Sequence, residues 1–360
     1  MIFIIFIAVL AILILSHEFG HFIFAKKAGL RVDEFGFGFP PKIFGVKRGG
    51  TLYSFNALPL GGFVKIYGED GQGGEDKKSF SGQPIRIRAL ILAAGVFFNL
   101  LLAWPFLTAS YIIGAPISAE ENIYGSAMTE KGIMIIQVQE KTPAEQAGLK
   151  TGDYLLQLAS KNKETLKAVD IKQFHDFIQK NAGSEITINY LRGKKEFQTR
   201  AIPAINPEPG KGSLGIAMDK VGIVKLPFFK AVWEGLKTTV KLVGLIAEAF
   251  VNFFRDIFTK REMLGQIAGP VGIAGILNNA MESGFTYIFQ LIAVLSINLA
   301  LINIIPFPAL DGGRLLFLAI EAIKGSAINQ KTTAAINNIG FAVLISLMLL
   351  VTYRDIIRLF

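Results

Sequence analysis

Long apolar stretches dominate the pattern of hydrophobic and polar positions along the chain. The first, MIFIIFIAVLAILILS, covers residues 1–16 without a charge, and its apolar character resumes at residues 22–25 after a short polar interruption. Three similar stretches lie at about residues 89–113, 287–305 and 333–353. A helix of about 20 apolar residues spans the hydrocarbon core of a bilayer. The pattern therefore predicts four transmembrane helices.

The composition supports a membrane protein. Hydrophobic residues make up 51% of the 360 residues, charged residues only 18%, and the mean hydropathy is +0.46. This is more apolar surface than a water-soluble core of this size can bury. The absence of cysteine excludes a disulfide scaffold and a zinc site built on thiolates. In a membrane chain the net charge of +9 matters through its position, and no nucleic-acid partner is expected.

The positions of the basic residues predict the orientation of the spans. Residues 26–88, between the first two spans, contain eleven Lys or Arg residues, whereas the segment between the last two contains only a few. Because short loops rich in Lys and Arg stay in the cytoplasm, we expect residues 26–88 there. The N-terminus and the long polar stretch after the second span are then outside. The first span lacks the flanking features of a signal peptide, so we expect it in the mature protein.

Residues 236–254 are apolar enough to resemble a fifth span. They carry Lys237, Lys241 and Glu248 at helical spacing, however. An amphipathic helix on the membrane surface fits this pattern better than a span.

Two of the three histidines stand four residues apart in the sequence HEFGH, residues 17–21. Positions i and i+4 of a helix share a face, so His17 and His21 can bind one zinc ion with Glu18 beside its open coordination position. The alternative is a polar cluster that reaches toward lipid headgroups. Ionisable side chains are costly within a span and are functional there by default, which favours the metal site.

A third ligand is expected, because a catalytic zinc takes three protein ligands and keeps a fourth position for water. His175 lies far away in the polar stretch, so this ligand should be a carboxylate. The best candidate is Asp311, within NIIPFPALDGG (residues 303–313) at the end of the third span. Asp311 could instead cap the next helix. The topology favours a ligand, because with four spans His21 and Asp311 reach the same side of the membrane.

HEFGH in the first span and NIIPFPALDGG late in the chain together resemble the site-2 protease family of intramembrane zinc metalloproteases, in particular its bacterial branch of sigma-E regulators. The resemblance covers essentially the whole chain. FGFGFP at residues 35–40 and GGFVK at residues 61–65 look like the family's membrane-associated β segment, and Gly95 and Asn99 in the second span also match.

The resemblance implies roles for individual residues. His17, His21 and Asp311 would bind Zn²⁺, and Glu18 would be the catalytic base. Asn303 would position the substrate or stabilise the oxyanion. A hydrogen bond between neighbouring helices is the alternative role of Asn303.

A transmembrane substrate must be locally unwound before cleavage, because its helix hides the backbone carbonyls in hydrogen bonds. A β segment near the metal can pair with the unwound strand. Gly61 and Gly62 are the candidates for that edge, and a plain interfacial hairpin is the alternative.

The alternation of apolar and polar positions in residues 131–203 predicts a small β-rich domain with short helices. The expected strands are residues 133–138, 186–190 and 196–201, and the expected helices are residues 143–148 and 171–179. The sequence TPAEQAGLKTGD, residues 142–153, resembles a PDZ domain of the kind found in bacterial proteases, in a single copy. This implies capture of peptides or gating of substrates outside the membrane. A folded spacer is the alternative.

The predicted fold is a polytopic α-helical membrane protein with four transmembrane helices, a membrane-associated β segment and an inserted extracytoplasmic PDZ domain of the α+β type. We expect four regions. They are residues 1–113 with the HExxH helix, the β loop and the second span; 114–220 with the PDZ domain and its flanks; 221–284 with amphipathic surface helices; and 285–360 with the NxxPxPxLDG motif and two spans.

The predicted function is site-2 cleavage in regulated intramembrane proteolysis, in a bacterial cytoplasmic (inner) membrane. The expected partners are the lipid bilayer and single-span substrates, which the resemblance implies to be anti-sigma factors or signal-peptide remnants. One alternative is a non-proteolytic PDZ-containing receptor or scaffold with a structural metal, which would have no use for Glu18 beside the metal. A metal transporter would need polar residues along several spans, whereas here they gather at one end of two.

Overall fold

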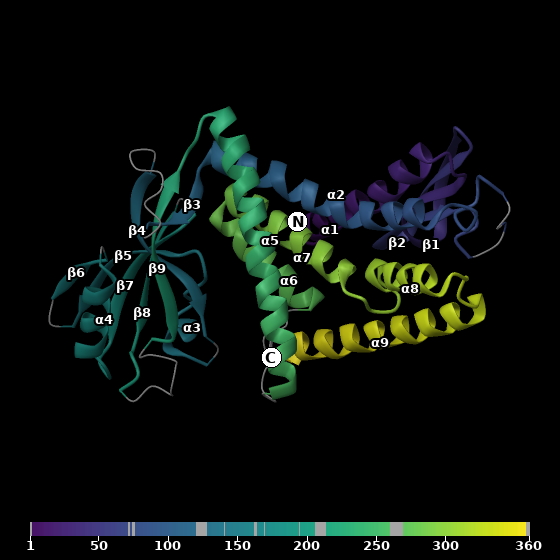
Figure 1. Cartoon of the computed structure of the whole chain (residues 1–360). Helices are drawn as coiled ribbons and strands as arrows, with labels where there is room; N and C mark the ends of the chain where they lie inside the picture. Colours follow the sequence, from purple (N-terminus) through teal and green to yellow (C-terminus); the bar gives the residue numbers. More distant parts are fainter. Residues whose placement is uncertain are drawn as a thin grey trace. The chain divides into compact units, whose positions relative to one another are not determined.

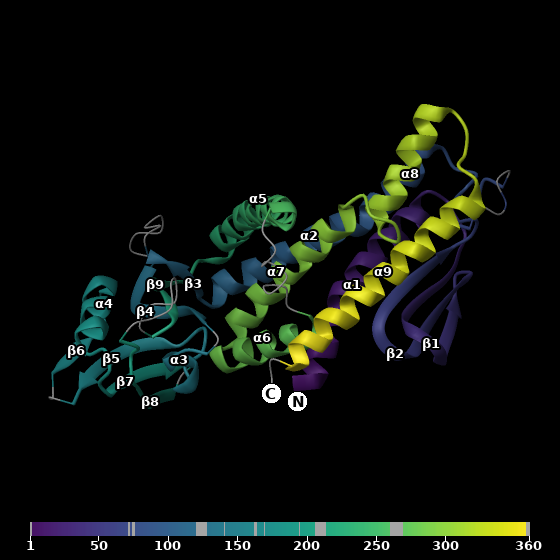
Figure 2. The same ribbon diagram turned by 90° about the horizontal axis from the view of Figure 1, so that it is seen from below.

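The computed structural model describes residues 2–70, 73, 76–119, 128–139, 141–161, 164–168, 170–193, 195–205, 214–259 and 269–357. The chain forms two compact units (Figures 1 and 2). The first, which we call the membrane unit, comprises Met1–Leu107, Gly235–Gly275 and Ile292–Phe360. The second, the β-rich unit, comprises Thr108–Glu234 and Ile276–Leu291.

Four helices are long and apolar enough to cross a membrane, as predicted. They are α1 (Ile2–Lys27), α2 (Ile85–Ile113), α7 (Phe285–Ile304) and α9 (Gln330–Ile357). The other long helices are α5 (Phe228–Thr259), α6 (Pro270–Ser283) and α8 (Asp311–Lys324). The ambiguous residues 236–254 lie in α5, which is not among the four candidate spans.

The chain turns sharply after α1. Gly29 adopts a φ of 79°, a left-handed conformation that favours glycine, and Leu30 N donates to Ala25 O at 3.0 Å. This arrangement is a common helix stop. It leads directly into the first strand, so the strands that follow begin beside the end of α1.

Strands β1 (Val32–Arg48) and β2 (Thr51–Ile66) form an antiparallel hairpin beside α1 (Figure 2). Gly49 and Gly50 join them with φ values of 56° and 81°, which suit a tight hairpin turn. The strand segments expected at residues 35–40 and 61–65 are confirmed.

The hairpin curls so that residues 34–37 of β1 pair on both sides, with residues 52–55 and with residues 62–65 of β2. No described strand pairs with the outer edge of residues 62–65. The hairpin therefore ends in an open strand edge.

A seven-stranded antiparallel sheet forms the β-rich unit, in the order β3-β9-β4-β5-β7-β8, with β6 paired to β5 (Figure 1). Its elements are β3 (Ala115–Ser118), β4 (Met128–Val138), α3 (Pro143–Gln146), β5 (Tyr154–Ser160), β6 (Thr165–Lys167), α4 (Ile171–Lys180), β7 (Ile186–Arg192), β8 (Lys195–Ala201) and β9 (Ile216–Val224). Ile133, Leu155, Leu158, Phe174 and Ile188 fill the core between sheet and helices. The predicted strands and the helix predicted at residues 171–179 are confirmed, the helix predicted at residues 143–148 ends at Gln146, and His175 lies on the exposed face of α4.

Candidate metal centre

Three side chains from distant parts of the chain bring one ligand atom each to the same point. His17 and His21 lie on α1, and Asp311 is the first residue of α8. Asp311 Oδ2 lies 3.0 Å from His17 Nε2 and 3.2 Å from His21 Nε2, and the two Nε2 atoms are 3.1 Å apart. The fold thus brings together the three residues that the sequence analysis proposed as metal ligands.

The triangle of donor atoms fits a zinc ion. Tetrahedral zinc with ligands at about 2.0–2.1 Å needs donor atoms about 3.3 Å apart, close to the separations observed here. Asp311 Oδ2 is buried and accepts no hydrogen bond within the described part of the chain, although two imidazole nitrogens lie next to it. A cation would satisfy this buried carboxylate oxygen, and two imidazoles with a carboxylate suit zinc.

A backbone carbonyl fixes the orientation of the His21 imidazole. His21 Nδ1 lies 2.8 Å from Ile91 O, and because a carbonyl only accepts, Nδ1 carries the proton and Nε2 is free for a metal. On the other side, the amide nitrogens of Asn99 and Asn303 each lie 3.5 Å from His17 Nδ1. Asn303 therefore lies beside the metal centre, as its proposed role requires.

Two glycines let α2 approach α1 closely at this point. A Cβ added to Gly20, inside the HEFGH motif, would overlap the carbonyl oxygen of Ala94. A Cβ added to Gly95 would overlap His21 Nε2 and lie 2.8 Å from His17 Cε1. Small residues permit such contacts between membrane helices. The packing role of Gly20 was not inferred from the sequence, where a glycine inside an apolar helix was the available signal.

The loop between α7 and α8 presents Asp311 to the imidazoles. Leu310 occupies the N-cap position of α8 and Asp311 is already helical, so the alternative in which Asp311 caps this helix is wrong. Close backbone packing holds the loop, because a Cβ on Gly312 or Gly313 would overlap carbonyl oxygens of residues 304–307.

Two arginine-carboxylate pairs hold α8 in place. Arg314 lies 2.5 Å from Glu69, and Arg88 Nη2 lies 2.5 Å from Glu321. Arg88 reaches Glu321 with a second nitrogen at 3.2 Å, which fixes the geometry more firmly than a single contact. These pairs attach α8 to the segment after β2 and to the start of α2.

Strand β2 passes beside Glu18. A Cβ added to Gly62 would lie 2.9 Å from Ile14 Cγ2 and 3.4 Å from Glu18 Cγ. A Cβ added to Gly61 would overlap the ring of Phe39 instead. Gly62 therefore faces α1 next to the candidate base, and Gly61 packs within the hairpin.

The family model described as peptidase family M50 matches residues 5–347. The regulator of sigma-W protease RasP of Bacillus subtilis is 29% identical over 440 residues, which cover 99% of this chain and 98% of that protein. The zinc metalloprotease RasP of Shouchella clausii is 28% identical over 438 residues, with the same coverage. A protein of Nostoc sp. is 32% identical over 360 residues, which cover 98% of this chain and 95% of its own.

Among solved structures, the PDZ domain of an SdrC-like protein from Listeria monocytogenes matches part of the chain. It is 25% identical, the match covers 25% of this chain and 90% of that one, and the TM-score is 0.21.

Proposed function

Because the chain belongs to peptidase family M50, the site-2 protease family of zinc metalloproteases, we propose that it cleaves single-span membrane proteins within the bilayer of a bacterial cytoplasmic membrane. The observation that carries this proposal is the meeting of His17, His21 and Asp311, with the two histidines on a candidate membrane span. A hydrolytic centre on such a helix has transmembrane peptide bonds within reach. Family membership favours a zinc metalloprotease over the alternatives of a non-proteolytic receptor and a metal transporter.

The residues divide the chemistry among them. His17, His21 and Asp311 would hold the ion. A zinc ion bound there would supply Lewis-acid chemistry for activating water and the scissile carbonyl. Glu18 takes a proton from the attacking water and passes it to the leaving amine. The amide of Asn303 donates to the oxyanion or holds the substrate backbone.

The open edge of β2 suits an unwound substrate. A substrate that leaves its helix needs new partners for its backbone groups, because the bilayer offers none. Residues 62–65 have one free strand edge and lie beside Glu18, so a substrate added there would be near the metal. We propose that Gly61 and Gly62 form this substrate-positioning edge.

Replacing Gly62 with Ala tests this edge. The added methyl group would push β2 away from Ile14 and Glu18, so we expect kcat/KM to fall about tenfold, since small misplacements near reacting groups are costly. Zinc content should not change. Gly45→Ala is the matched control, because its new Cβ would lie 3.1 Å from Leu52 Cδ1 and 3.2 Å from Tyr53 O, within the hairpin and not against Ile14 or Glu18. Equal kcat/KM values for the two variants would argue against the edge.

The substrate class and topology follow from the same proposal. A relative is named a regulator of sigma-W protease, and we propose anti-sigma factors or signal-peptide remnants, already trimmed by another protease, as substrates. Residues 26–88 would be cytoplasmic and the β-rich unit extracytoplasmic. The regions 1–113, 114–220, 221–284 and 285–360 stay a prediction.

We further propose that the β-rich unit is a PDZ domain that restricts access of untrimmed substrates. Strand β9 supports peptide capture by strand addition, because β3 pairs only with its residues 221–224. Next to β3 on that side, no described strand pairs with residues 216–219, and α4 packs near β9. An extended peptide could add to this edge.

Cleavage in nanodiscs tests the proposed function. The purified protein should cut a trimmed single-span substrate inside its apolar segment, as located by mass spectrometry of the products. A zinc chelator should abolish the cut, and added zinc should restore it. An untrimmed substrate should be cut more slowly. A cut outside the apolar segment, or one that the chelator leaves intact, would contradict the proposal.

A further inference from the structure

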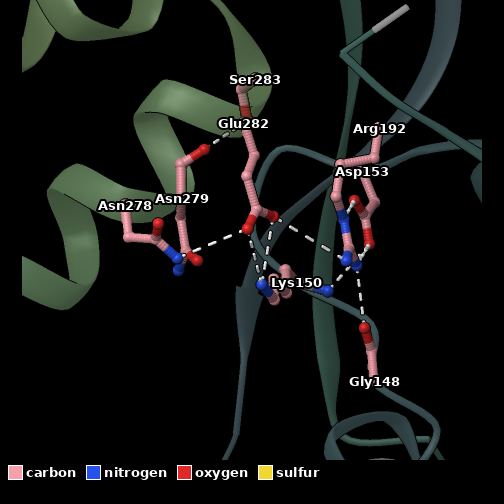
Figure 3. Close-up of polar contacts among 8 residues, drawn as sticks. All are labelled: Gly148, Lys150, Asp153, Arg192, Asn278, Asn279, Glu282 and Ser283. Carbon is pink, nitrogen blue, oxygen red and sulfur yellow. Dashed lines mark hydrogen bonds and ion pairs between the residues drawn. The ribbon is translucent and has the colours of Figure 1, made fainter. Parts of the chain in front are cut away.

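Within the β-rich unit, a cluster of charged side chains attaches the seven-stranded sheet and its loops to the end of α6 (Figure 3). Lys150 Nζ donates to both carboxylate oxygens of Glu282, at 3.1 and 3.3 Å. Arg192 Nη1 lies 4.0 Å from the same carboxylate. These residues belong to one compact unit, which also includes residues 276–291 at the junction of α6 and α7.

The basic residues of this cluster are held in place by contacts that do not involve Glu282. Arg192 donates to both carboxylate oxygens of Asp153 at 2.7 Å and to Gly148 O at 2.8 Å. The side chain of Asp153 is only 1% exposed and also accepts from Lys150 N at 2.8 Å. The hydrogen bond to Asp153 raises the pKa of Arg192 above its usual value. Lys150 and Arg192 thus present a fixed positive site to Glu282.

Close contacts without charge extend the attachment. A Cβ added to Gly152 would lie 2.7 Å from Ser283 Oγ, and one added to Gly193 would lie 2.5 Å from Glu282 O. Beyond the junction, the hydroxyl groups of Tyr154 and Tyr287 lie 3.1 Å apart. The sheet and its loops therefore contact the last turn of α6 and the first turn of α7.

The attachment spans a potential pivot. Gly284 alone separates α6 from α7, and its φ of 120° favours glycine. Glu282 lies on one side of this residue and Tyr287 on the other, so their contacts fix the angle between the helices. We call Lys150, Arg192, Glu282, Tyr154 and Tyr287 the junction latch.

We propose that the junction latch positions α7 and thereby Asn303 at the metal centre. This inference rests on the proposed function and on the proposed role of Asn303. The helix α7 continues without interruption from Tyr287 to Asn303, about 24 Å at 1.5 Å per residue. We therefore expect a change at the first turn of α7 to shift the Asn303 amide, which lies 3.5 Å from His17. Glu282 is a positioning residue that acts through this helix.

Charge reversal in the full-length protein in nanodiscs tests the latch. We expect Glu282→Lys to lower kcat about five- to tenfold, with KM within about twofold and the zinc content unchanged. This is the pattern for displacement of a group, here the Asn303 amide, that acts in the transition state. The double variant Lys150→Glu with Glu282→Lys should recover at least about half of the lost kcat. Glu164→Lys is the matched control, because it breaks the exposed pair with Lys180 elsewhere in the same domain.

A designed disulfide supplies an independent test, since the chain has no cysteine. A Cβ at residue 152 would lie 3.6 Å from Ser283 Cβ, within the usual range for disulfides. Gly152→Cys with Ser283→Cys should therefore cross-link on mild oxidation. In the Glu282→Lys background, the oxidised form should regain kcat and the reduced form should not. The reduced double-cysteine variant with native Glu282 shows how much kcat is lost by replacing Gly152 itself, whose φ is 93°.

The outcomes separate the latch from the proposed function. Normal kcat in Glu282→Lys, or a defect that neither the charge swap nor the cross-link repairs, would overturn the latch. Failure of the wild-type protein with bound zinc to cut any trimmed substrate would instead overturn the proposed function. In that case the cross-linking yield still decides whether the junction is docked, and no cross-link would overturn the latch.

Discussion

The Glu18→Gln variant is expected to lose about 10²- to 10⁴-fold in kcat, the range for removing a general base, while zinc stays bound. Glutamine has nearly the same shape as glutamate but cannot take a proton from water. His17, His21 and Asp311 remain in place, so the metal donors are intact. The measurement pairs the cleavage rate of a trimmed substrate with the zinc content of the same preparation.

Glu248→Gln is the matched control for this experiment. Glu248 is exposed on α5 and outside the metal centre, so its amide should leave kcat unchanged. Activity that survives in Glu18→Gln with zinc present would show that another group moves the proton. A variant that loses its zinc would point to a ligand role for Glu18.

Gly95→Ala should lower zinc affinity about 10- to 100-fold, the range for changes next to metal ligands, and activity should fall with it. The new methyl group would overlap His21 Nε2, the atom that faces the metal site. Alanine is also a better helix former than glycine by about 1 kcal/mol, so α2 itself should not be weakened. Competition with a chromophoric chelator measures the affinity directly.

Gly244→Ala controls for the general effect of adding a methyl group to a helix in the same unit. Nothing lies within 4 Å of a Cβ at Gly244 on α5, so zinc affinity should match that of the wild type. If Gly95→Ala also kept wild-type affinity, the imidazoles would not be held against α2 as described.

The sequence was sufficient where a local pattern carries the information. Apolar runs predicted α1, α2, α7 and α9, because each run alone satisfies the length of a bilayer. The spacing of His17 and His21 placed them on one helical face. Asp311 could be proposed because topology restricted which carboxylates reach the same side of the membrane.

Other features depend on contacts between distant segments and could not be predicted in this way. Alternation within β2 does not reveal that residues 52–55 and 62–65 both pair with β1. The charge of Glu282 gave no sign of its partner Lys150, which lies 132 positions earlier in the chain. The packing of Gly20 likewise depends on which helix faces it.

The glycine contact between α1 and α2 has a consequence for the response to lipid. With Gly20 against the backbone of Ala94, the two helices meet main chain to main chain and have no side-chain layer to adjust. Bilayers of different thickness change helix tilt. Here α1 and α2 must tilt together, because sliding one past the other would drive Gly95 into the imidazoles. Membrane thickness should therefore alter the depth at which a substrate meets the metal, and leave the metal coordination itself unchanged.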